Sequence, residues 1–139
     1  MSRPAAHSAA TLALDDLTRV TLDWNQGALA EGLRLYRAGE FFAAHEEWES
    51  VWLVTPEPEK TFLQGVIQVT AAFHHLQRNN PLGATRLLNA ALRRLEPCSP
   101  HFGGIAVDLL RDDIRDCLHA LTTAPPAANR LRPPRIHPL

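Results

Sequence analysis

Apolar residues recur at intervals of three and four along most of the chain, the spacing of one face of an α-helix. From residue 12 to residue 121 no run of strand length alternates apolar and β-branched residues with polar ones. We therefore predict an all-α fold without a sheet. The expected architecture is a single bundle of about five helices built from antiparallel hairpins.

Turn and capping residues divide this pattern into segments. Gly39 is typical of a left-handed helix C-terminus, and Thr55-Pro56 and Asn80-Pro81 are typical of helix N-termini. A weak segment over residues 12–22 precedes the predicted helices, which cover residues 24–38, 40–54, 56–78, 81–95 and 105–121.

Composition bounds the domain organisation. The 139 residues are 45% hydrophobic and 21% charged, which fits one packed domain. We expect a partly disordered N-terminal extension at residues 1–22, a helical domain at 23–122 and a Pro/Arg-rich tail at 123–139. The tail carries charge +3, which leaves −4 for the rest of a chain of net charge −1. We expect a solvated tail, with docking on a partner or on an acidic face of the domain as the alternatives.

Charge and hydropathy also exclude classes of partner. The net charge is near zero and no nucleic-acid motif occurs, so we expect no nucleic-acid binding. No apolar run reaches the roughly 18 residues that cross a bilayer, so we expect no membrane insertion. The two cysteines lack CxxC spacing and no secretory signal is evident, which predicts a cytoplasmic protein. Homo-oligomerisation stays open.

Two polar residues fall on the apolar face of the predicted helix 40–54. At about 100° per residue, His45 and Glu49 lie in the middle of its aromatic face, and Glu46 lies at the border. A buried unpaired charge is costly, so these side chains need partners. The predicted helix 56–78 offers a polar stripe on an otherwise apolar surface, which we expect to face them; it consists of Gln64, Gln68 and His75.

One interpretation of this cluster is a divalent metal or small-ligand site. An imidazole and a carboxylate four residues apart can share an ion, and a histidine from a facing helix completes the set. The metal-ligand candidates are His45, Glu49 and His75, with Glu46 at the edge and Trp52, Gln64 and Gln68 behind them. The pattern departs from the His-Glu-x-x-His of metalloproteases, because Glu49 stands where the second histidine belongs.

Two other interpretations compete with a ligand site. The cluster can be a hydrogen-bonded network that fixes how two helices dock in a non-enzymatic scaffold. Alternatively, the domain is an interaction module. Six of the eight glutamates lie between Glu40 and Glu59, a stretch without Lys or Arg that suits a basic partner or the chain's own tail. Whether the protein is an enzyme, and which residues would be catalytic, stays open.

These motifs resemble a known family. The text Gly39-Glu-Phe-Phe-Ala-Ala-His45-Glu46-Glu-Trp48-Glu49-Ser-Val-Trp52, followed by Phe62-Leu-Gln64-Gly65-Val-Ile-Gln68 and by His75, is similar to the family named domain of unknown function 309. The resemblance covers about residues 24–121 and includes Gly103-Gly-Ile-Ala-Val-Asp108. It implies a small all-α domain with no established activity.

Overall fold

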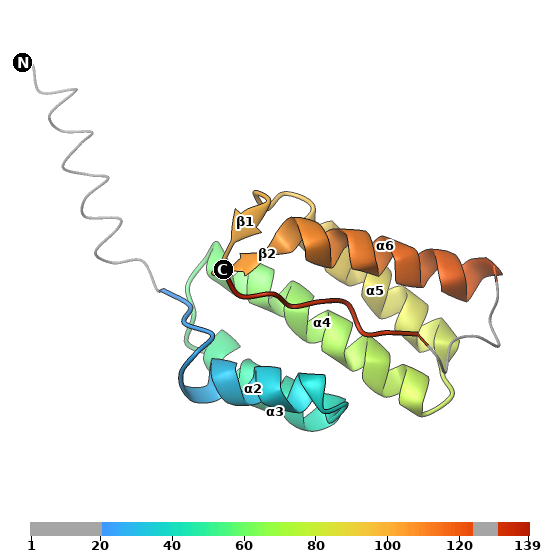
Figure 1. Ribbon diagram of the computed structural model, residues 1–139, viewed down its shortest axis with the longest axis horizontal. Helices are drawn as coiled ribbons and strands as arrows, with labels where there is room; N and C mark the ends of the chain where they lie inside the picture. The colour runs from blue at the N-terminus through green and yellow to red at the C-terminus, as the bar shows by residue number, and fades with distance from the viewer. Residues whose placement is uncertain (1–20, 124–130) are drawn as a thin grey trace, which may run out of the picture.

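The computed structural model describes residues 21–123 and 131–139 (Figure 1). Each predicted helix from residue 24 onward is present, so the all-α fold class is confirmed; the described helices are α2 (Gly27–Arg37), α3 (Phe41–Trp52), α4 (Glu59–Gln77), α5 (Pro81–Leu95) and α6 (Val107–Thr123). Most of the predicted segment 12–22, and the extension that contains it, lie outside the described residues.

Two antiparallel hairpins and a further helix form the bundle. Helices α2 and α3 lie side by side on one flank of α4, and α5 and α6 lie on its other flank (Figure 1). Helix α4 contacts both α3 and α5, and most of its residues are buried. Helix α4, which corresponds to the predicted helix 56–78, is therefore the central helix of the bundle.

Of the two helix starts predicted from a capping residue followed by proline, one is confirmed and the other is wrong. Asn80 caps α5 as predicted, because its side-chain oxygen accepts a hydrogen bond from Gly83 N at 3.0 Å. Thr55 is not the N-cap of α4: its hydroxyl donates to Val51 O at 2.6 Å and closes the end of α3 instead. Helix α4 begins at Glu59, three residues after the predicted start at Pro56.

The prediction that the chain has no sheet is wrong, because the structure contains a short sheet. Strands β1 (His101–Phe102) and β2 (Ile105–Ala106) pair antiparallel, and Ile105 also bridges Pro138. Gly103 and Gly104 reverse the chain with φ values of 61° and 84°, which side chains other than glycine rarely adopt. Two-residue strands are too short to show a period of two, which explains the difference.

The chain end lies against the domain. Residues 131–139, which we call the strap, cross in front of α4 and end near β2 (Figure 1). The Tyr36 hydroxyl donates to Pro134 O at 2.7 Å, and Ile136 is only 4% exposed. The structure thus shows docking on the domain itself rather than the solvated tail that we expected. Among the described residues, no helix combines the length and the apolar character that crossing a membrane requires.

Candidate functional site

Helices α3 and α4 meet along a half-exposed surface that holds most of the predicted site. At one end the rings of Phe42 and His74 lie 5.4 Å apart. At the other end Lys60 Nζ donates to Trp52 O at 2.9 Å and lies 4.0 Å from the Trp52 ring centroid. The two helices therefore run antiparallel. We call this surface the α3–α4 seam and define it by the residues that the register brings opposite one another: Phe42, His45, Glu49 and Trp52 on α3, and Lys60, Gln64, Gln68 and His74 on α4.

His45 and Glu49 come together as predicted, but less deeply than predicted. His45 Nε2 lies 3.5 Å from Glu49 Oε2, and the imidazole stacks on Phe42. The two side chains are 27% and 52% exposed, so the cluster lies at the edge of the core and the prediction of a buried cluster is wrong in this respect. The buried residues of α3 are Phe41, Ala44 and Trp48, so the buried face of this helix is turned away from Glu49, which the 100° wheel placed in the middle of it.

Three polar atoms of the seam are buried and lack a hydrogen-bond partner among the described residues. They are His45 Nδ1, Trp52 Nε1 and Gln68 Oε1. A buried polar group without a partner costs free energy and is uncommon in folded proteins. Two of these groups, Trp52 and Gln68, were predicted to lie behind the ligands; the structure places their unpartnered atoms inside the seam itself.

His75 does not join His45 and Glu49. Its Nδ1 lies 2.9 Å from Asn80 Nδ2, at the beginning of α5. Its neighbour His74 instead contacts Phe42, on which His45 stacks. Within the described residues, no group of three or more His, Cys, Asp or Glu side chains is arranged to hold a metal ion. The described structure does not bring His45, Glu49 and His75 together, and a metal centre at these residues stays a prediction.

The α3 side of the seam carries negative charge, which attracts cationic groups. Exposed carboxylates surround it on α3, and neither Glu46 nor Glu49 pairs with a lysine or arginine of the described chain. The pKa of His74 is lowered, chiefly by burial and further by the nearby Arg78, His75 and His45, so its imidazole is neutral at physiological pH. Gln64 is half-buried, and its side chain forms no hydrogen bond within the described residues.

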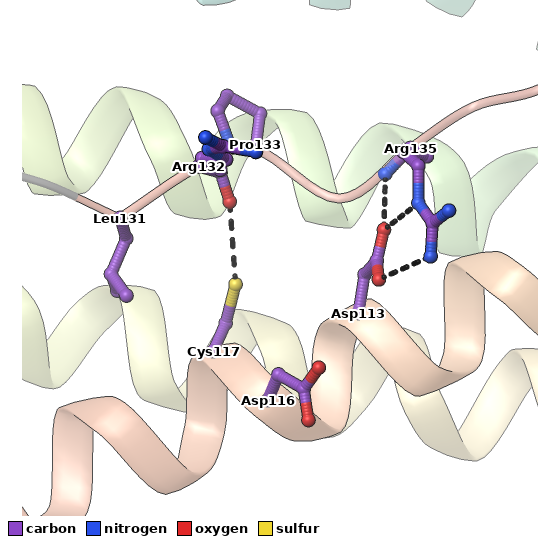
Figure 2. A pocket seen from close by; sticks show the side chains of 7 residues that line it. All are labelled: Asp113, Asp116, Cys117, Leu131, Arg132, Pro133 and Arg135. Carbon is purple, nitrogen blue, oxygen red and sulfur yellow. Dashed lines mark hydrogen bonds and ion pairs between the residues drawn. The ribbon is translucent and has the colours of Figure 1, made fainter.

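A second polar site lies under the strap and was missed by the sequence analysis. Asp113 of α6 accepts hydrogen bonds from the Arg135 backbone N–H at 2.8 Å, from Nε at 2.9 Å and from Nη2 at 3.1 Å (Figure 2). Burial alone would raise the pKa of Asp113, but these hydrogen bonds and the guanidinium charge hold it below its ordinary value. The positive charge of the tail was the signal for this site in the sequence, but it did not indicate which acidic residue pairs with Arg135.

Cys117 lies beside this ion pair, with its thiol turned toward the strap. Its thiol donates to Arg132 O at a sulfur–oxygen distance of 3.6 Å (Figure 2). Burial, with added repulsion from Asp113 and Asp116, raises the pKa of this thiol to about 11. The thiol is therefore protonated at neutral pH and serves as a hydrogen-bond donor to the strap.

Fold and seam together define a small all-α domain of antiparallel hairpins with a polar surface between α3 and α4. A family model described as domain of unknown function (DUF309) matches residues 29–87 of the chain. The resemblance inferred from the motifs is thereby confirmed from α2 into α5. Every residue of the seam lies inside the match, whereas Asp113 and the strap lie outside it.

The chain is similar to part of a longer curated protein. An uncharacterized protein of Aquifex aeolicus (strain VF5) is 30% identical over 91 residues, which is 65% of this chain. The aligned region spans only 27% of that relative. Neither comparison assigns an activity, so the function is unknown, as the sequence analysis expected.

Proposed function

We propose that the domain acts by binding and that the α3–α4 seam holds an extended, positively charged segment of a partner protein. The observation that carries this proposal is the set of three buried polar atoms without partners, His45 Nδ1, Trp52 Nε1 and Gln68 Oε1. Each such group costs about 1–3 kcal/mol when unpaired, so a ligand toward which these side chains turn, and which supplies the missing partners, gains that free energy on binding.

The spacing of these atoms favours an elongated ligand. His45 and Trp52 are seven residues apart on α3, which is roughly 10 Å along the helix axis. A single ion is too small to reach both side chains. A peptide backbone offers one donor and one acceptor per residue, so it can accept from Trp52 Nε1 and donate to Gln68 Oε1 along the same line.

Charge and exposed apolar surface define the chemistry of the segment. Residues 40–59 contain six glutamates and neither Lys nor Arg. Phe42 is 53% exposed beside His45, and Leu53 is 65% exposed just past Trp52. A segment with Lys or Arg near Glu46 and Glu49 and with an apolar residue at each end matches this surface.

A divalent ion is the other ligand predicted for this cluster from the sequence. His45 and Glu49, four residues apart and 3.5 Å from each other, are the two predicted ligands that could share an ion. An ion at this pair leaves Trp52 Nε1 and Gln68 Oε1 without partners, so the peptide segment accounts for more of the seam. The binding experiment includes the ion as a competing outcome.

The test is selection of ten-residue peptides from a random library against the full chain. We expect binders that are rich in Lys or Arg and carry aromatic or aliphatic residues, and that lose at least about tenfold in affinity for Gln68→Leu and for Trp52→Phe. Asn89→Leu is the matched control, because Asn89 is exposed on α5, far along the chain from the seam, and its side-chain amide bonds only to Thr85 O within its own helix.

Two results would overturn the proposal. One is the absence of any binder that distinguishes Gln68→Leu from the wild type while both proteins are folded. The other is stoichiometric Zn²⁺ binding that His45→Ala abolishes and that no selected peptide displaces. The second result would assign the seam to an ion instead.

A further inference from the structure

The strap lies on the domain as a bound peptide lies in a recognition groove. Its backbone is extended, and alternate side chains point inward: Pro134 and Ile136 are buried, whereas Arg135 and His137 between and after them are exposed. This alternation is the period of two of an extended segment. The strap also joins the small sheet, since Ile105 bridges Pro138.

Groups from several elements hold the strap backbone. Tyr36 and Arg37 of α2 donate to Pro134 O at 2.7 Å and to Ile136 O at 3.4 Å. From the β1–β2 hairpin, Ala106 N donates to His137 O at 3.0 Å, and Gly104 O accepts from Leu139 N at 3.0 Å. Backbone contacts of this kind recognise any extended segment, and side-chain contacts add the preference for one sequence.

Two features select the sequence. The Arg135 guanidinium forms a forked pair with Asp113, a geometry that lysine does not reproduce. Ile136 fills a buried position next to α2 and β2. The groove therefore recognises an extended segment with arginine followed by an aliphatic residue, preceded by proline.

The strap is held at these points and not along its whole length. A cavity of about 380 Å³ on the α6 side, shown in Figure 2, is lined by Asp113, Asp116, Cys117, Leu131 and Arg132 among others. A second cavity of about 620 Å³ on the α2 and α4 side is lined by Tyr36, Phe41, Phe73, Leu76, Leu131 and Pro133. The helices also contact one another directly, so the segment can leave and re-enter while the bundle keeps its helix–helix contacts and loses the burial of Ile136.

We propose that this groove also binds the strap in trans, and that its occupant is the strap of a second copy of this chain. A reciprocal exchange remakes every contact of the closed monomer with an identical segment, so it needs no new interface. Within one copy the strap has an effective concentration of the order of 1 mM, so exchange competes only when the protein is concentrated or when the contacts within one copy are weakened.

A charge-exchange experiment on the full chain separates binding in trans from binding in cis. Asp113→Arg places two guanidinium groups together within one copy, and Arg135→Asp places two carboxylates together. When the two variants are mixed, the altered groove of the first accepts the altered strap of the second, and the reverse pairing is the wild-type contact. The double variant Asp113→Arg/Arg135→Asp carries the pair within one copy and is the matched control.

Light scattering on a sizing column reads the outcome. We expect each single variant to remain monomeric, the equimolar mixture to have the mass of a dimer, and the double variant to be monomeric. A mixture that keeps the monomer mass, with both variants folded by circular dichroism, would overturn the proposal.

A second measurement covers the case in which either variant fails to fold. Sedimentation of the wild type from about 10 µM to about 1 mM should show a dimer fraction that rises with concentration, because exchange is bimolecular. Ile136→Asp, which removes the apolar anchor of the strap, should abolish that rise. A wild type that stays monomeric to about 1 mM, or an unchanged rise in the variant, contradicts the exchange.

Discussion

Trp48 lies against the backbone of Gly32, where no side chain larger than hydrogen fits. A Cβ built on Gly32 would overlap the indole ring of Trp48. The same indole donates from Nε1 to Leu29 O at 3.1 Å, and Trp48 is fully buried. The pair sets how closely α2 and α3 approach, and so it orients the face of α3 that carries His45 and Glu49.

Gly32→Ala should therefore destabilise the protein, although alanine is the better helix former by about 0.5–1 kcal/mol. We expect the free energy of unfolding to fall by about 1–3 kcal/mol, the usual cost of overpacking. Urea denaturation measures the change. Gly32→Ala/Trp48→Phe should lose less than the sum of its two single variants, because the smaller ring makes room. Strict additivity would argue against the contact.

The two tryptophans of α3 should respond in opposite ways to the same substitution. Trp48→Phe removes a made, buried hydrogen bond to Leu29 O and leaves a smaller ring in a fully buried position, so we expect a loss of about 1–3 kcal/mol. Trp52→Phe removes a buried N–H that has no partner in the described protein, so the free protein should be unchanged or up to about 1 kcal/mol more stable. Chemical denaturation without added ligand decides, and an equal loss in both variants would contradict the unpartnered state of Trp52.

The helices could be predicted from the sequence wherever their ends are fixed by local contacts. The start of α5 at Pro81 was predicted correctly, since Asn80, which caps it, is its neighbour in sequence. The start of α4 was misplaced because Thr55 can cap forward or close the preceding helix, and its hydroxyl bonds back to Val51 O. Sequence pattern gives the capping residue but not the direction in which it bonds.

The candidate site was predictable only in part, for a similar reason. The i, i+4 spacing of His45 and Glu49 places them together on any helix, so their contact needed no knowledge of the fold. His75 instead contacts Asn80, which lies beyond the end of α4, so a helical wheel drawn for α4 alone cannot show this contact. The strap contacts join residues such as Tyr36 and Pro134, which are 98 positions apart, so no local sequence pattern predicts these contacts.

Acid should release the strap. The pKa of Asp113 is lower in the folded protein than its ordinary value, so the unfolded chain binds more protons as the pH falls below about 4. The stabilisation from the Arg135 pair is therefore present above that pH and is lost as the pH falls through the folded pKa. Asp113→Asn should be less stable than wild type near neutrality, and the difference should vanish in acid. Calorimetry of both proteins across this range checks the sign.

Cys117 offers a chemical measure of whether the groove is covered. With Cys98→Ser as background, the thiol at 117 should react with iodoacetamide at about pH 8 at least about 100-fold more slowly than a free cysteine, because a pKa of about 11 leaves little thiolate. Ile136→Asp should raise that rate by about tenfold or more, since the strap no longer covers Sγ and water lowers the cost of the thiolate. The reciprocal protein, Cys117→Ser with Cys98 intact, should react at the same rate with and without Ile136→Asp. The same labelling can be applied to the dimer of the charge-exchange mixture. A strap exchanged between copies still covers the thiol, so slow labelling of that dimer would indicate exchange. Fast labelling would indicate that the groove is open.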